Sequence, residues 1–331
     1  MTNTLDSKLT TIRNGEYSSK NFIIADAKDG DMAMGMAAPG PAPAGSTKSF
    51  LSKGDYLEKM RVMTRSGLVD IMLMSASSAE VLVGEGLFNE SSVTPAVRLN
   101  DTTDIWALRG NRYQCHPSRP FSTINLEKAH KLAGLGLYSV TFSNDLDHDY
   151  ASTTTYKTFR EKAVPCGMNH FLEVFNPGPD IDTGLSAEDL PFFINDAIAR
   201  ILGGVTSEEQ PLFLKIQYNG PKAMEELATY DPQNIIVGIL GGSKGTTRDT
   251  LELVCQAERY GARVALFGRK INLADDSVSL VTMMRAVIEG ELSTEEAVKY
   301  YHGVLSEKGI VPTIPLDEDI LVTDPILKQI A

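Results

Sequence analysis

The residues Pro211-Leu212-Phe213-Leu214-Lys215-Ile216-Gln217-Tyr218 form an apolar run that contains one lysine. A short run of this kind predicts a buried strand. Side chains alternate between the two faces of a strand, so Leu214 and Ile216 share one face and Lys215 lies on the other. Lysine is seldom fully buried without a partner or a function, so Lys215 is the first candidate for chemistry.

A lysine on an interior face loses the hydration of its ammonium group. This favours the neutral amine, which is the form that attacks a carbonyl carbon. The position of Lys215 therefore suggests a lysine that forms a Schiff base. The alternative is a structural lysine at a strand end, which reaches solvent or pairs with a carboxylate.

Seven further apolar runs resemble this one, and amphipathic stretches separate them. The predicted strands are residues 22–26, 69–74, 94–99, 138–142, 170–175, 212–217, 235–240 and 263–268. The predicted helices are residues 56–66, 79–86, 153–164, 191–202, 222–230, 248–260, 277–289 and 294–306. Eight strands with helices between them predict an α/β fold, the single-domain (β/α)₈ TIM barrel. The alternative is an open doubly wound sheet, but the first strand is not followed by the Gly-rich nucleotide fingerprint typical of that fold.

The chain divides into a barrel and three less regular segments. Its 331 residues suit one large α/β barrel or two ordinary domains. We assign residues 1–20 to a polar N-terminal segment, 21–310 to the barrel and 311–331 to a C-terminal tail packed on the outside. Residues 31–52, rich in Met, Ala, Gly and Pro, exceed an ordinary βα loop and form either a mobile lid or a tolerated insertion.

Composition excludes several classes of function. The formal net charge of -12 argues against a nucleic-acid surface, although a local pocket can still bind a small anion. The cysteines Cys115, Cys166 and Cys255 form no CxxC pair, and the 5 histidines are not spaced like metal ligands, so we expect no metal or cofactor. No run approaches the roughly 20 apolar residues of a membrane span, and residues 1–19 lack the apolar core of a signal peptide. A cytoplasmic location follows as the simplest expectation.

Charged side chains occur near the ends of several predicted strands, where barrel enzymes place catalytic groups. Glu173 shares its strand face with Phe171 and Phe175, which predicts an inward carboxylate beside Lys215. Such a carboxylate can shuttle protons; a structural Lys–Glu pair is the alternative. Asp26 ends the first strand and is a third catalytic candidate, with Lys28 close behind as a candidate substrate contact.

Glycine-containing loops follow the last two predicted strands. Barrels commonly bind phosphate there through backbone N–H groups. The residues concerned are Gly241, Gly242 and Ser243 in one loop and Gly268 and Arg269 in the other, and ordinary turn glycines are the alternative interpretation. Arg98, near the end of the third strand, is a further substrate-binding candidate.

Four short motifs resemble those of class I, Schiff-base aldolases related to tagatose-bisphosphate, sulfofructose-phosphate and archaeal class I fructose-bisphosphate aldolases. They are Ile24-Ala25-Asp26-Ala27-Lys28, Phe171-Leu172-Glu173, Leu214-Lys215-Ile216 and Phe267-Gly268-Arg269. The resemblance covers most of residues 20–275 in order and spacing. It implies that Lys215 is the imine lysine, that the substrate is a sugar or sugar phosphate, and that the protein is a homo-oligomer.

The chain also departs from this family. The Gln of the strand-one motif is Ala27, and the strand-four lysine of tagatose-bisphosphate aldolases is absent, that strand offering Ser139, Thr141 and Ser143. Residues 175–177 are Phe-Asn-Pro where the archaeal enzymes have Tyr-Pro-Arg. The substrate and the proton donor therefore stay open, with Tyr218 and His148 as other proton carriers.

These features favour a metal-independent class I aldolase in which Lys215 forms the imine, Glu173 moves protons and Asp26 assists. Two other hypotheses remain. A phosphosugar isomerase or epimerase would use Glu173 as its base and Lys215 as an electrostatic partner. A barrel that binds a sugar phosphate without turning it over would need neither.

Overall fold

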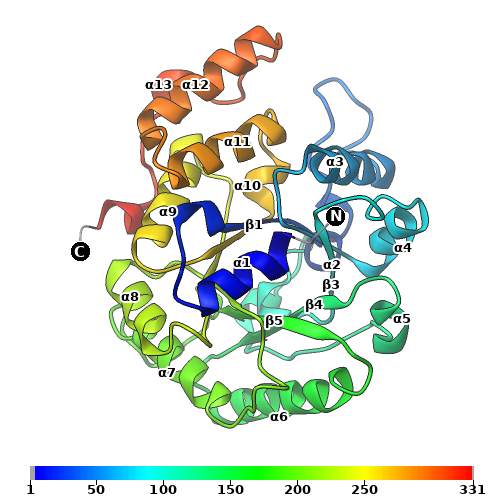
Figure 1. The fold of residues 1–331 in the computed structure, drawn as a ribbon, viewed down its shortest axis with the longest axis vertical. Coiled ribbons are helices and arrows are strands. Elements are labelled where there is room, and N and C mark those ends of the chain that lie inside the picture. Colours follow the sequence, from blue (N-terminus) through cyan, green and yellow to red (C-terminus); the bar gives the residue numbers. More distant parts are fainter. Residues whose placement is uncertain (1–3, 330–331) are drawn as a thin grey trace.

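A computed structural model describes residues 4–329 of the chain. Its eight parallel strands close into a barrel, with β1 paired to both β2 and β8 (Figure 1). The strands are β1 Ile23–Lys28, β2 Ile71–Met74, β3 Thr94–Arg98, β4 Leu135–Thr141, β5 Asn169–Phe175, β6 Leu214–Ile216, β7 Gly238–Leu240 and β8 Val264–Phe267. The predicted (β/α)₈ barrel is confirmed, and the open doubly wound sheet is excluded because β1 and β8 are hydrogen-bonded neighbours.

Helices surround the barrel and connect successive strands (Figure 1). They are α1 Thr4–Arg13, α2 Asp31–Met34, α3 Lys53–Ser66, α4 Ala76–Gly84, α5 Leu126–His130, α6 Leu146–Ala163, α7 Leu190–Leu202, α8 Pro221–Tyr230, α9 Thr247–Arg259, α10 Arg269–Asn272, α11 Ser277–Ile288, α12 Thr294–Glu307 and α13 Leu316–Asp319. α6 begins earlier than predicted because the Asp145 side chain accepts a hydrogen bond from the backbone N–H of His148 and caps the helix. None of the helices described is long and apolar enough to cross a membrane.

The strands separate two apolar cores. Alternate residues such as Ala25, Phe171 and Phe213 fill the barrel interior, whereas their neighbours Ile24 and Leu214 pack beneath the helices. This alternation is the period of two expected of strands. It fixes which side chains at the carboxyl end of each strand can point into the mouth of the barrel.

A helix that the sequence analysis missed closes the opposite end of the barrel. Residues 1–20 were expected to form a polar segment, but α1 lies across the barrel opening (Figure 1) and its Leu5, Leu9 and Ile12 pack into the interior core. Lys8 fixes this helix, since its Nζ lies 2.8 Å from the Asp70 carboxylate and donates to the Phe22 carbonyl oxygen at 3.0 Å. The three apolar residues follow the i, i+4, i+7 spacing of an amphipathic helix, and this signal was overlooked because the segment is otherwise polar.

The C-terminal tail also differs from the prediction. It does not only pack outside the barrel, because the 3₁₀ helix η5 Pro325–Lys328 and the residues before it reach the cavity at the carboxyl ends of the strands. Asp249 near the start of α9 anchors it, accepting hydrogen bonds from the backbone N–H groups of Thr323 and Asp324 at 2.7 and 3.1 Å. The tail is thus part of the wall around that cavity.

Residues 31–52 lie over the carboxyl end of β1. They contain α2 and the 3₁₀ helix η2 Gly35–Ala37, and a short antiparallel bridge joins Pro41 to Phe50. Ala33, Met34 and Ala38 of this segment line the cavity. The segment therefore covers one side of the barrel mouth, as expected for either a lid or an insertion at this position.

We predict that Leu9→Ala lowers the free energy of unfolding by about 2–4 kcal/mol, because it removes a buried side chain from the plug of the barrel. Chemical denaturation measures the change. Ser7→Ala on the exposed face of α1 is the matched control and should change stability by less than about 0.5 kcal/mol. Equal effects of the two substitutions would show that α1 does not stabilise the barrel.

Candidate active site

A cavity of about 870 Å³ lies at the carboxyl ends of the strands, where barrel enzymes build their active sites. Residues from β1, β3, β5, β6, β7 and β8 and from the loops that follow them line it. Among them are Asp29, Arg98, Asp104, Glu173, Asn176, Lys215, Asn219, Gly241, Gly242, Ser243, Gly268, Arg269 and Lys270. Most of the predicted site residues are therefore brought together in one cavity.

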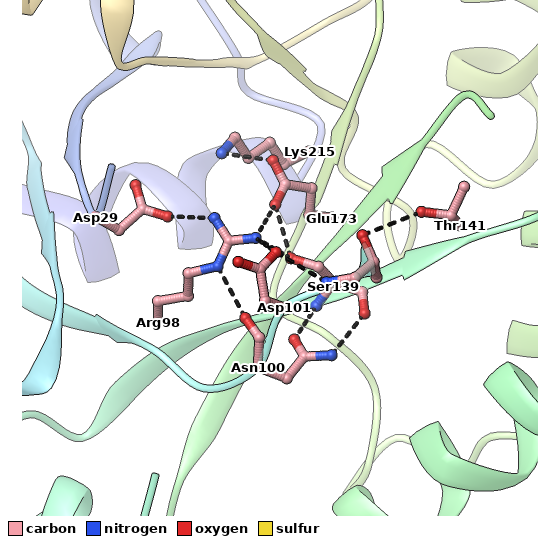
Figure 2. Close-up of polar contacts among 9 residues, drawn as sticks. Asp29, Arg98, Asn100, Asp101, Ser139, Thr141, Glu173 and Lys215 are labelled. Carbon is pink, nitrogen blue, oxygen red and sulfur yellow. Dashed lines mark hydrogen bonds and ion pairs between the residues drawn. The ribbon is translucent and has the colours of Figure 1, made fainter. Parts of the chain in front are cut away.

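Lys215 and Glu173 form a buried pair inside the barrel mouth. They lie opposite one another on β6 and β5, and Lys215 Nζ is 2.6 Å from Glu173 Oε1. Glu173 and Lys215 are 1% and 6% exposed. The second carboxylate oxygen of Glu173 accepts a hydrogen bond from the Ser139 hydroxyl of β4 at 2.7 Å (Figure 2). The sequence-based prediction that both residues point inward on neighbouring strands is confirmed.

Arg98 occupies the centre of the polar network around this pair (Figure 2). Its guanidinium donates to Asp29 Oδ2 at 2.7 Å, to Asp101 Oδ1 at 2.8 Å and to the Asn100 carbonyl oxygen at 2.8 Å. It also lies 3.9 Å from Glu173. Its charge is thus opposed by several carboxylates, so Arg98 holds protein groups in place. Arg98 also lines the cavity, and the substrate contact expected of it stays a prediction.

The network sets the charge of its carboxyl groups. Burial alone would raise the pKa of Asp29, but the positive charges of Arg98 and Lys215 outweigh it and lower that pKa below its ordinary value. Burial has the larger effect on Asp101 and raises its pKa to about 6 despite the nearby Arg98. Asp29 is consequently held as an anion beside Lys215, whereas Asp101 protonates more readily than Asp29.

Asp26 and Lys28 do not belong to this cavity. On β1 the inward residues are Ala25 and Ala27, so Asp26 and Lys28 point outward, beneath the helices. There Lys28 Nζ lies 2.5 Å from Asp26, with both side chains at 1% exposure or less. The predicted catalytic role of Asp26 and substrate contact of Lys28 are therefore wrong, because both predictions overlooked the alternation along β1.

Asp29 is the cavity residue that takes the place expected for Asp26. It continues the inward series Ala25 and Ala27, lines the cavity and is 4% exposed. The alternation was the available signal. It was hard to apply because both faces of β1 carry small or apolar residues before the charged ones begin.

The two glycine-containing loops border the cavity as predicted. Gly268 permits a close approach, since a Cβ atom there would lie 2.9 Å from the Ala27 carbonyl oxygen. Gly242 adopts a φ of +66°, in the left-handed region that favours glycine. Arg269 and Lys270 follow Gly268 in α10, and Lys270 was not predicted as a site residue.

The alternative proton carriers are placed differently. Tyr218 lines the cavity, but its hydroxyl donates to the Gln256 side chain at 3.2 Å. His148 lies in the first turn of α6, where its Nδ1 is 2.7 Å from Asp145 Oδ1, and it does not line the cavity. Residues 4–329 contain no group of three or more His, Cys, Asp or Glu side chains placed to hold a metal ion.

A lysine ion-paired to an inward carboxylate at the mouth of a barrel can be compared with solved enzymes of the same fold. No protein-family model and no curated protein matches this sequence. Its structural neighbours include Schiff-base aldolases.

A fructose-bisphosphate aldolase from Slackia heliotrinireducens superposes with a TM-score of 0.65 at 13% identity, covering 91% of this chain and 90% of the other. An archaeal fructose 1,6-bisphosphate aldolase gives 0.61 at 18% identity, over 86% and 99% of the two chains. A further archaeal structure, whose catalytic lysine is covalently bound to a carbinolamine intermediate, gives 0.59 at 17% identity over the same shares. At this level of identity the likeness establishes the shared fold.

Asp104, in the 3₁₀ helix η3 Thr103–Ile105, adds an unexpected buried carboxyl to the cavity wall. Burial raises its pKa to about 6. The hydroxyls of Thr102, Thr141 and Ser118 lie near enough to moderate that shift, but none forms a hydrogen bond of good geometry with either carboxyl oxygen. Asp104 is 3% exposed. Ionisation of its buried carboxyl therefore changes the free energy of unfolding.

We predict that Asp104 makes the protein less stable as the pH rises. Its folded pKa lies above the unfolded value, so the folded state binds more protons between the two values, and ionisation costs about 3 kcal/mol by about pH 7. Asp104→Asn should therefore gain stability relative to the native protein at about pH 7.5 but not at about pH 4. Urea denaturation at both pH values measures this, with exposed Asp196→Asn on α7 as the control. The same difference at both pH values would contradict it.

Proposed function

We propose that the protein is a class I aldolase that cleaves or forms a carbon–carbon bond of a ketose or ketose phosphate through a Schiff base on Lys215. The observation that supports this most directly is the 2.6 Å contact between Lys215 Nζ and Glu173 Oε1 inside the cavity. A short contact between a buried amine and a buried carboxyl supplies both a nucleophile and the group that manages its protons. We also retain a cytoplasmic homo-oligomer as part of this proposal.

The pair can generate the reactive amine by itself. Proton transfer from Lys215 Nζ to Glu173 Oε1 leaves a neutral amine and a carboxylic acid. The amine adds to the carbonyl carbon of the ketose and gives a carbinolamine, and the Glu173 acid then protonates the departing hydroxyl so that water leaves. The product is a protonated imine, and the carboxylate is regenerated.

The protonated imine is the electron sink for cleavage. A carboxylate removes the proton from the hydroxyl two carbons beyond the imine carbon. The C–O bond becomes a carbonyl, the neighbouring C–C bond breaks, and its electron pair forms an enamine on Lys215. Protonation of the enamine and hydrolysis of the resulting imine release the second product. No step requires a metal ion.

Glu173 contacts Lys215 directly, and Asp29 lies close enough for the charge of Lys215 to lower its pKa. We assign to Asp29 the assisting role that the sequence had suggested for Asp26, because Asp29 lines the cavity. Burial raises the pKa of Asp29, but the charges of Arg98 and Lys215 lower it by more, which favours the carboxylate form. Arg98 and Ser139 are positioning residues that hold Asp29 and Glu173. The loops at Gly241–Ser243 and Gly268–Arg269 would hold a phosphate.

We predict that Lys215→Met and Lys215→Arg both reduce aldol cleavage by roughly 10⁴-fold or more, since neither side chain can form an imine. Steady-state assays with a panel of ketose phosphates measure this, and circular dichroism checks folding. The arginine variant is informative because it preserves the positive charge beside Glu173. An isomerase that uses Lys215 only as an electrostatic partner would retain activity in Lys215→Arg, and that result would contradict the aldolase proposal.

We predict that Arg269→Ala raises the Michaelis constant for a phosphorylated substrate by roughly ten- to a hundredfold, the effect of losing a hydrogen bond to a charged group. Activity toward an unphosphorylated analogue should change much less. Arg259→Ala, at the exposed end of α9, is the matched control and should leave both constants unchanged. Equal losses with the two substrates would instead make Arg269 a structural residue.

A further inference from the structure

The positive charges of the cavity are unevenly available to a ligand. The cationic side chains that line it are Arg98, Lys215, Arg269 and Lys270. Arg98 is engaged by Asp29 and Asp101, and Lys215 is engaged by Glu173. Neither can compensate the charge of a bound anion without first losing a protein partner.

The other two cations lie together at one end of the cavity, in α10 after β8. Among the described residues, Arg269 forms no ion pair or side-chain hydrogen bond, and Lys270 Nζ donates only to the Lys244 carbonyl oxygen at 3.1 Å. Burial lowers the pKa of both, that of Lys270 to about 8, and the charges of Asp249 and Asp324 oppose the shift of Lys270 without forming an ion pair with it. One anion between these residues and the Gly241–Ser243 loop would supply a close counter-ion.

The rest of the described cavity lining offers no comparable unpaired cation. The loop after β3 contributes Asp104 and Ile105 to the cavity, and Asn176 and Asn219 follow β5 and β6. Asn176 and Asn219 bond each other reciprocally, at 2.8 and 3.2 Å between their amide nitrogen and oxygen atoms. Each amide keeps one N–H and one oxygen lone pair free for a ligand hydroxyl. The cations of this part of the wall are Arg98 and Lys215, and both are already engaged by carboxylates.

We infer that the cavity is built for a substrate with a single anionic group, held by Arg269 and Lys270, whose other end is uncharged and carries hydroxyl groups. The carbonyl chemistry of this inference rests on the proposed aldolase function. The number of anionic groups that the cavity can bind does not depend on that function. A second phosphate would meet the Asn176–Asn219 pair and the carboxyl of Asp104. It would gain no ion pair there and would lie near a like charge.

This expectation differs from the activity named for the structural neighbours, which are fructose-bisphosphate aldolases. A second well-placed cation would strengthen binding of a bisphosphate by roughly ten- to a hundredfold over a monophosphate. Without that cation the two ligands should bind about equally. The ratio of the two affinities therefore measures the number of anion sites.

Two titrations test the inference. Calorimetry of the native protein with inorganic phosphate should give one binding site per chain. That site should be lost in Arg269→Ala and kept in Arg109→Ala. Arg109 is the control because it stacks on Phe50 and does not line the cavity. Binding of fructose 1-phosphate, fructose 6-phosphate and fructose 1,6-bisphosphate to Lys215→Met, which cannot form an imine, should place the bisphosphate within about threefold of the better monophosphate. If Lys215→Met does not fold, Lys215→Arg is used in its place.

Three results would overturn the inference: two phosphate sites per chain, no phosphate binding at all, or a bisphosphate that binds at least about tenfold more tightly than either monophosphate. Weaker bisphosphate binding in Arg109→Ala would also count against it, since it would reveal a second cation that reaches the ligand. None of these measurements involves an imine. Failure of the aldolase proposal would instead appear as correct binding ratios without any turnover of a ketose phosphate by the native enzyme.

Discussion

The structure of the site depends on one constraint, which is that charged groups buried in the mouth of a barrel must compensate one another. Lys215 and Glu173 do so across 2.6 Å, and Arg98 does so for Asp29 and Asp101. Removing one partner of such a pair leaves an uncompensated charge that typically costs 3–5 kcal/mol. The network therefore holds its members in fixed positions, which is what proton transfer between an amine and a carboxylate needs.

The fold supplies this arrangement through strand alternation. Each inward position near the carboxyl end of a strand faces the same small volume, so residues far apart in the sequence, such as Arg98 and Lys215, share one network (Figure 2). α1 closes the other end of the barrel with apolar side chains. The charged cluster thus opens toward the cavity, which the loops after the strands line.

Much of this could be predicted from the sequence, and the exceptions have identifiable causes. The apolar runs gave the eight strands and the inward direction of Lys215 and Glu173, because on those strands a charged residue stands among plainly apolar neighbours. On β1 both faces begin with apolar or small residues, so the alternation that separates Asp26 from Asp29 was hard to apply. The partners of Arg98 could not be predicted either, since they come from loops and from other strands, whose spatial order is set only when the barrel closes. α1 was missed because a helix with three buried residues looks polar in sequence.

The central claim is that Lys215 forms a covalent imine with a ketose. The most direct measurement is intact-protein mass spectrometry after incubation with a ketose phosphate and sodium borohydride, followed by peptide mapping of the product. The account predicts a mass increase of one reduced substrate or donor fragment per chain, located on the peptide that contains Lys215 and absent in Lys215→Arg. Cleavage of the substrate without any borohydride-dependent adduct, or an adduct on another lysine, would contradict it.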